Sequence, residues 1–294
     1  MIRNKYIDHG VHGFLLVCVL ITVAVTLSVI FVLSEETWQF FQQVPLPDFL
    51  FGTQWQPIIK PQTFGVLPLL AGTVLIVVGA SIVALPMGLL VATYLNEFAS
   101  EKQRSVVKPI LEILAGIPTV VYGYFALTFI TPLLKAVYPE TEIFNAASGA
   151  LVVGIMILPM VASLVDDGFR AVPRALREGA YGLGATRYEV ITQVVMPAAG
   201  SRIGAAVVLA VSRAVGETMA VTMAAGATPN MTINPFESIQ TMTAYIVQVS
   251  LGDTPAGGIE YLTAFAVGTL LFVLTLLMNA VGNHFIHKMS WETT

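Results

Sequence analysis

The sequence predicts an all-α integral membrane protein with six transmembrane helices and both termini in the cytoplasm. Of the 294 residues, 56% are hydrophobic and only 11% are charged, whereas a soluble domain carries about 25% charged residues. Six apolar stretches approach or exceed the length of about 20 residues that a helix needs to cross a bilayer. The net charge of −4 says little, because the position of each charge matters more than the sum.

The first apolar stretch, residues 14–33, follows a short polar start. It is longer than the 7–15 apolar residues of a cleaved signal peptide, so we expect a retained helix. Residues 34–65 then leave the membrane. They carry Trp38 and Trp55 together with four prolines, and Trp is typical of membrane interfaces whereas Pro interrupts helices. Cys18 is the only cysteine, so an intrachain disulfide is excluded.

The second, third and fourth spans are expected at residues 66–94, 109–134 and 147–165. The third contains Gly116 and Pro118 near its centre, and proline removes a helical hydrogen bond and clashes with the preceding turn. A broken helix at membrane depth is tolerated where it is buried in protein or lines a cavity. The sequence leaves open whether this is such a break beside a pathway or an ordinary proline kink.

The fifth span, residues 205–226, has only two charged residues, Arg213 and Glu217. In a continuous helix they share one face, with an otherwise all-alanine stripe formed by Ala206, Ala210, Ala220 and Ala224. A charge at this depth costs roughly 2.5–3.5 kcal/mol, so such residues usually face a cavity or a partner. A solute pathway is therefore the leading interpretation, and an internal ion pair within a tight helix contact is the alternative. A second outer segment, 227–260, and a sixth span, 261–282, complete the chain.

Lys and Arg are distributed very unevenly over the predicted loops, as the positive-inside rule requires. The outer segments, including the short loop after the third span, hold only Lys60 and Lys135. Eleven of the 14 basic residues fall on the inner side, if the N-terminus is inside: Arg3, Lys5, Lys102, Arg104, Lys108, Arg170, Arg174, Arg177, Arg187, Arg202 and Lys288.

Residues 173–184 predict a short amphipathic helix on the cytoplasmic face. Pro173 suits the first turn, and Gly184 suits the end. Leu176, Ala180 and Leu183 form an apolar stripe beside charged residues. Such a helix either lies on lipid or docks into a groove of a protein partner, and periodicity alone does not choose between them.

The run Glu178-Gly179-Ala180, three residues, Gly184, nine residues and Val194-Val195-Met196-Pro197 resembles the EAA signature of ABC-importer permeases, E-A-A, three residues, G, nine residues, I-x-L-P. It departs at Gly179, Val194 and Met196. The resemblance implies a type I ABC importer permease fold in which residues 173–184 form a coupling helix that inserts into an ATPase subunit. It assigns ATPase coupling to Arg174, Arg177, Glu178, Gly179, Ala180, Leu183, Gly184 and Pro197.

The segment SRAVGETMAV resembles the G-R-A-x-G-E-T-M-A-V segment of PstC-type permeases of phosphate ABC importers, with Ser212 in place of the glycine. Similar stretches include FLFGTQWQP at 49–57 and LAGIPTVVYG at 114–123. The family implies a heterodimer with a sister permease, two ATPase subunits that bind ATP and Mg, and an extracytoplasmic phosphate-binding protein, in a prokaryotic inner membrane. It places Arg213 and Glu217 on the phosphate pathway.

Catalytic function is not expected of this chain. It has no Walker A motif, G-x-x-x-x-G-K-[ST], to hold nucleotide phosphates. No cluster of metal ligands or nucleophile constellation stands out, and nothing indicates a nucleic-acid surface. His284 and His287 are interpreted as interfacial polar residues rather than metal ligands, because other ligand types are lacking. We therefore expect no cofactor bound to this chain itself.

The charged pair suggests which solute passes. Arg213 can present a planar fork of donors to a tetrahedral oxyanion. Glu217 would repel a fully ionised anion, but its carboxylate can accept the proton of hydrogen phosphate, which sulfate lacks. Three rivals remain: a permease for molybdate or sulfate, a proton-coupled secondary transporter, and a structural scaffold with a buried ion pair.

Overall fold

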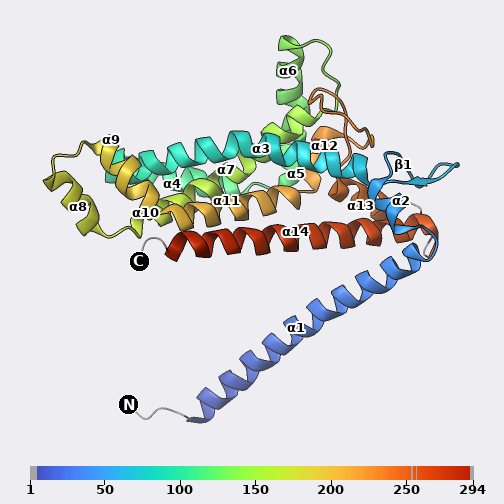
Figure 1. Ribbon diagram of the computed structural model, residues 1–294, viewed down its shortest axis with the longest axis horizontal. Helices are drawn as coiled ribbons and strands as arrows, with labels where there is room; N and C mark the ends of the chain where they lie inside the picture. Colours follow the sequence, from blue (N-terminus) through green and yellow to red (C-terminus); the bar gives the residue numbers. More distant parts are fainter. Residues whose placement is uncertain (1–4, 253, 256, 292–294) are drawn as a thin grey trace.

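The computed structural model describes residues 5–252, 254–255 and 257–291, and over this range the chain is almost entirely helical (Figure 1). The exception is a small antiparallel hairpin of β1 (Trp55–Gln56) and β2 (Thr63–Phe64). The long helices α3 (Leu67–Thr93), α7 (Ala146–Arg170) and α14 (Ile259–Trp291) run along one axis of the molecule. The hairpin lies at the opposite end of this axis from α8 (Arg174–Gly182).

Five described helical segments are long and apolar enough to cross a membrane. They are Val11–Phe41, Leu67–Phe98, Thr119–Val137, Ala146–Arg170 and Ile259–His284. A sixth span arises if the pair Arg187–Ala198 and Gly200–Val215, bent by 70°, counts as one. The structure thus gives a multi-pass helical protein with five or six spans among the described residues.

The predicted third span is the first that differs. Residues 101–116 form a separate helix, α4 (Glu101–Gly116), which buries none of its residues. After residues 117–118 the chain continues as α5 (Thr119–Phe125), the π-helix η2 (Ala126–Ile130) and α6 (Thr131–Val137). The interruption expected at Gly116 and Pro118 is therefore present, whereas the segment long enough to cross a membrane is Thr119–Val137 rather than 109–134. Lys108 and Glu112 give α4 a polar face, and Pro118 cannot continue an α-helix.

The predicted fifth span, 205–226, is also divided. It consists of α11 (Gly200–Val215) and α12 (Met219–Ala225), separated by residues 216–218. The α12 helix ends at Gly226, whose φ of +93° suits only a residue without a side chain. The continuous helix expected from hydropathy alone is wrong here, because hydropathy does not register where the backbone hydrogen-bond ladder stops.

The main core lies between α3 and α7, which pack closely along their length. Small residues make this possible: a Cβ atom on Gly79 would lie 2.7 Å from the Cβ of Ala150, and one on Gly88 would lie 2.6 Å from Val161 Cγ1. Close helix approach through small residues is the usual way to gain packing energy in a bilayer, where no hydrophobic driving force joins helices. The α7 helix also contacts α11 and α12, so it lies at the centre of the helix packing.

A second core gathers aromatic side chains at the hairpin end of the molecule. Phe40 of α1 (Lys5–Phe41) meets Phe49 of α2 (Leu46–Phe51) edge to face, with ring centroids 5.5 Å apart. Trp55 of β1 meets Tyr245 of α13 (Met242–Leu251) at 4.8 Å. These contacts fix the outer segment predicted for residues 34–65 against the start of α14.

The α1 helix diverges from the bundle toward its N-terminus (Figure 1). It extends beyond the predicted span of 14–33, and none of the residues in its most apolar window is buried. It is attached near its C-terminal end, where the Thr37 and Thr269 hydroxyls lie 2.7 Å apart. A large apolar surface of α1 is thus left for lipid or a neighbouring helix.

The close approach of α3 and α7 makes a testable prediction. We expect Gly88→Ala to lower the free energy of unfolding by about 1–3 kcal/mol, because the added methyl group overlaps Val161. The measurement is denaturant unfolding of the purified protein in detergent. Gly13→Ala is the control, since nothing lies within 4 Å of its Cβ position. Equal effects of the two substitutions would contradict the proposed packing.

Candidate functional site

Arg213 lies in the last turn of α11 and is exposed. Its guanidinium makes no hydrogen bond or ion pair with any residue that the structure describes. A cation within an apolar segment that has no partner is costly, and such groups usually face a cavity, a partner or a solute. Arg213 is therefore a free donor group on the surface of this subunit.

Glu217 lies in the break between α11 and α12 and is only 7% exposed. One carboxylate oxygen accepts the backbone N–H of Ala220 at 3.3 Å, which supplies an acceptor at the start of α12. Its backbone carbonyl accepts the Thr243 hydroxyl at 2.8 Å. Because α11 ends at Val215, the expectation that Arg213 and Glu217 share one helix face is wrong, and no ion pair joins them.

The alanine stripe is a packing surface rather than an open face. Four of its members are at most 1% exposed: Ala206, Ala210, Ala220 and Ala224. The α11 helix packs against α7 and α14, and α12 packs against α5 and α7. A Cβ atom on Gly123 of α5 would lie 3.2 Å from the Cα of Ala220, so these two helices nearly touch. The tight helix contact is thus the interpretation that fits the alanines, while Arg213 stays exposed.

The helical structure is also interrupted at Gly116 and Pro118. The α4 helix ends at Gly116, and Pro118 is the residue immediately before α5. The buried side chain of Tyr122 donates its hydroxyl to the carbonyl of Leu114 at 2.7 Å, across the break. The helix that follows this break, α5, packs against the helix that follows the Glu217 break, α12.

The segment expected to couple to an ATPase forms α8, which runs from Arg174 to Gly182 after Pro173 and buries none of its residues. Gly184, two residues after its end, has a φ of +86°. Leu183 is 92% exposed, and the other coupling candidates that are exposed are Arg174, Glu178, Gly179, Gly184 and Pro197. Ala180 instead packs partly against the main core.

Arg177 is turned inward rather than toward a partner. Its guanidinium forms an ion pair with Glu97 of the π-helix η1 (Tyr94–Phe98). It also donates to the Phe169 carbonyl at 2.7 Å and to the side-chain oxygen of Asn96 at 3.3 Å. Of the eight residues assigned to coupling by resemblance, Arg177 is the one that the geometry ties most firmly to its own subunit.

The chain between α8 and α11 turns sharply beside Pro197. It comprises α9 (Arg187–Glu189), the π-helix η3 (Val190–Val195) and α10 (Met196–Ala198), and it meets α11 at the 70° bend. The Thr186 hydroxyl and the Glu189 carboxylate form a reciprocal cap at the start of α9. Hydrogen bonds from the backbone and then the hydroxyl of Thr186 lower the pKa of Glu189, so this cap holds an ionised carboxylate.

The sequence analysis did not single out Asp166, whose side chain is fully buried near the C-terminal end of α7. Arg104 donates to both carboxylate oxygens at 2.7 and 2.9 Å. Lys108 and Arg170 lie 3.3 and 3.2 Å away, and Asn96 donates at 3.2 Å. The available signal was an aspartate four residues before an arginine at the end of an apolar span.

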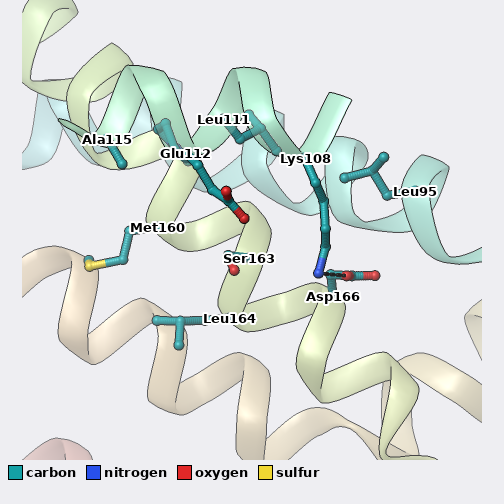
Figure 2. Close-up of a pocket in the computed structure, with 10 residues that line it drawn as sticks. Leu95, Lys108, Leu111, Glu112, Ala115, Met160, Ser163, Leu164 and Asp166 are labelled. Atoms are coloured by element: carbon teal, nitrogen blue, oxygen red, sulfur yellow. Dashed lines mark ion pairs between the residues drawn. The ribbon is translucent and has the colours of Figure 1, made fainter. Parts of the chain in front are cut away.

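A cavity of about 290 Å³ opens beside this cluster, between α4 and α7. Figure 2 shows Lys108 and Glu112 reaching from α4 toward α7, where Ser163 and Asp166 lie, with the Lys108–Asp166 ion pair drawn. The rest of its lining is mostly apolar: Leu95, Leu111, Ala115, Pro159, Met160 and Leu164.

Metal ligands do not gather in the described part of the chain, where no group of three or more His, Cys, Asp or Glu could hold an ion. His284 is exposed on α14. The side chain of His287 lies outside the described residues, as does Arg3.

Residues 84–291, more than half of the chain, match the family described as binding-protein-dependent transport system inner membrane component. The chain belongs to this family. The family members are permease components of ABC transporters, which fits a multi-pass inner membrane subunit. The match includes α8, the 70° bend and both residues of the predicted pathway.

Curated relatives resemble most of the chain. The Bacillus subtilis protein named "Probable ABC transporter permease protein YqgH" is 33% identical over 94% of this chain and 90% of its own. The phosphate transport system permease protein PstC of Haemophilus influenzae is 33% identical over 82% of this chain and 81% of its own. Among solved structures, a bacterial ABC transporter that imports alginate has a TM-score of 0.68 at 18% identity, over 97% of this chain and 99% of that one. That likeness shows the permease fold.

The geometry of Glu217 can be tested by unfolding. We expect Glu217→Ala to lower the free energy of unfolding by about 1 kcal/mol, because the N–H of Ala220 loses its acceptor. Since no ion pair joins Glu217 to Arg213, the combined variant with Arg213→Gln should be additive within about 0.5 kcal/mol in a double-mutant cycle. A larger coupling energy would mean that the two side chains do pair.

Proposed function

We propose that this chain is a transmembrane permease subunit of an ATP-driven phosphate importer. Permeases named PstC that are 32–34% identical to it over about four fifths of the chain support this assignment. The structural observation that carries it is the exposed Arg213 guanidinium, which has no partner among the described residues. In this proposal the unused donors of Arg213 bind phosphate as it passes.

Arginine suits this role better than lysine. Its planar guanidinium presents parallel N–H donors that match two oxygens of a tetrahedral anion, and it stays charged at any physiological pH. The α11 helix is held by its buried alanines against α7 and α14, which leaves Arg213 on the open side. A sister permease that covers this side would complete the pathway between the two subunits.

Glu217 has a different position and, we propose, a different role. One oxygen of its carboxylate caps α12, and the side chain lies in the break immediately after the helix of Arg213. The negative charge disfavours an anion that brings no proton, while hydrogen phosphate can donate its O–H to the carboxylate. The proposed selection of phosphate over sulfate thus rests on charge at Glu217, not on contact with Arg213.

Energy would come from outside this chain. The α8 helix and the residue after it expose Glu178, Gly179 and Leu183 on the end of the molecule that also carries the end of α14 (Figure 1). We propose that this surface docks into one subunit of an ATPase dimer, which holds ATP and Mg, and that this end is cytoplasmic. An extracytoplasmic phosphate-binding protein would deliver solute at the hairpin end. The apolar part of the α1 helix, which buries none of its residues, is available to the sister permease.

The central test is phosphate uptake by the complex co-purified from membranes and reconstituted with its binding protein. We expect Arg213→Gln to lower the phosphate uptake rate by about 10–100-fold, the loss of one charge-assisted contact. Arg213→Lys should retain part of the rate, because it keeps the charge but not the fork. Unchanged uptake in Arg213→Gln would support the structural scaffold instead.

Substrate selectivity tests Glu217 separately. We expect Glu217→Gln to reduce the preference for phosphate over sulfate by about tenfold, because the amide oxygen still accepts the N–H of Ala220 but no longer repels the dianion. Competition between labelled phosphate and unlabelled sulfate or molybdate measures the ratio. If wild-type uptake is inhibited more strongly by molybdate or sulfate than by phosphate, the chain serves that anion. Uptake that survives ATP depletion but collapses with the proton gradient would identify a secondary transporter.

A further inference from the structure

Polar contacts hold the α8 helix to its own subunit, and the only residue of α8 that packs partly against the main core is Ala180. None of its residues is buried, and its strongest contacts come from Arg177. That side chain pairs with Glu97, donates to the Phe169 carbonyl at 2.7 Å and donates to Asn96 at 3.3 Å. A helix attached in this way can move relative to the bundle unless the polar contacts resist.

Asn96 has a second partner on its other side. Its amide N–H donates to Asp166 at 3.2 Å, while its amide oxygen accepts from Arg177. Only this orientation of the amide satisfies both neighbours, because a carboxylate needs a donor and a guanidinium needs an acceptor. Asn96 therefore joins the guanidinium of α8 to the carboxylate of α7.

Asp166 is the fixed end of this connection. Its fully buried carboxylate is held by Arg104 and Lys108 of α4 and by Arg170 of α7. A buried charge with several partners has few alternative arrangements, because leaving any partner exposes it to an apolar surrounding without compensation. Asp166 and these partners, which we call the Asp166 node, connect α4, α7 and the end of α3 at the end of the molecule where α8 lies.

Asn96 and Glu97 are both in η1, one turn of π-helix at the end of α3. A π-turn inserts an extra residue into the helical ladder, and such turns are frequent at functional sites. The C-terminal residue of this turn is followed by Ala99, whose N–H reaches back to the Tyr94 carbonyl at 2.8 Å. The turn places two consecutive polar side chains, Asn96 and Glu97, against Arg177.

We propose that Arg177, Asn96 and Asp166 form a polar link that positions α8 and transmits its movement to α3, α4 and α7 during transport. All three are positioning residues, and none contacts the solute. The inference rests on the proposed function only in taking α8 as the helix that meets the ATPase. It assigns Arg177, a residue of the EAA-containing segment, to the inner side of the coupling helix.

The test is a double-mutant cycle on the reconstituted importer, with phosphate transported per ATP hydrolysed as the readout. Asn96→Leu and Arg177→Gln should each lower this ratio by about two- to thirtyfold. If they act in one link, the double variant is no worse than Arg177→Gln alone. Arg177→Lys should recover part of the ratio. Multiplicative effects of the two changes would overturn the link.

A matched pair of charge changes on α4 controls for surface charge. Arg104→Gln removes a partner of Asp166 and should lower the ratio, whereas Lys102→Gln removes an exposed charge that pairs with no described residue and should not. Asn96→Asp keeps an acceptor for Arg177 but faces Asp166 with a second carboxylate, so it should be no better than Asn96→Leu. Equal effects of Arg104→Gln and Lys102→Gln would count against the node.

A readout without solute separates this inference from the proposed function. Amide hydrogen exchange over residues 174–182 of the assembled complex should be several-fold faster in Asn96→Leu than in wild type. If exchange rises but the importer carries another anion, the link stands and the phosphate proposal fails. If phosphate is carried but exchange and transport ratio are both unchanged, the link fails alone. Exchange is measured on purified complex, so a variant that does not assemble is recognised beforehand. If Asn96→Leu does not assemble, the exchange of residues 174–182 in Arg104→Gln replaces it as the test.

Discussion

Helices in a bilayer must satisfy every backbone polar group within the protein, because no water replaces a lost partner. Both broken spans of this protein obey that constraint with side chains. Tyr122 supplies a donor to the Leu114 carbonyl across the break at residues 117–118, and the Glu217 carboxylate supplies an acceptor to the N–H of Ala220. The breaks are thus built features, and the helices that follow them, α5 and α12, pack together. The predicted fifth span is divided immediately after α11, the helix that carries Arg213.

The same constraint explains why the buried charged side chains of this protein have polar partners. Asp166 is fully buried and has three cationic partners, and Arg177 is paired with Glu97. Glu217 is buried and serves as a cap. Arg213 alone among these is exposed and unpaired within the described chain. Arg213 keeps an unpaired guanidinium inside a predicted membrane span, which is why it carries the functional proposal.

Much of the architecture could be predicted because it depends on composition and local chemistry. The long apolar runs gave α1, α3, α7 and α14, and the Pro173 and Gly184 pair bounded the short helix α8. The family followed from the EAA-like run and the segment around Arg213. Gly116 and Pro118 indicated the interruption of the third span, but the prediction of the fifth span failed in its interior, since hydropathy measures side chains whereas a helix ends where backbone partners change. The alanine stripe left two interpretations open, because small residues permit a pathway and a close contact equally, and only the neighbouring helices decide between them.

Tertiary contacts outside any local pattern account for the rest. The role of Asp166 depends on its hydrogen bonds with Arg104 and Asn96, which are 62 and 70 residues away in the chain. No spacing rule relates such positions, and the π-turn that presents Asn96 looks in sequence like the ordinary end of an apolar helix. Arg177 was assigned to ATPase coupling by resemblance to the family, which does not fix the direction of its side chain. Its inward direction depends on Phe169 and Glu97, which belong to other helices.

The α7 helix connects the two functional ends of the molecule. At its start, the backbone N–H of Asn145 donates to the Ala224 carbonyl of α12 at 3.0 Å, and those of Ala146 and Ala147 hold the outer segment through Glu237 and Pro235. At its other end, the Phe169 carbonyl accepts from Arg177 of α8. Between these ends α7 packs closely against α3 through small residues. A shift of α8 that moved α7 along its axis would therefore reach α12, and with it the break that holds Glu217, without any change in the helices between. The positions of the Glu217 break and of α8 therefore both depend on the packing of α7.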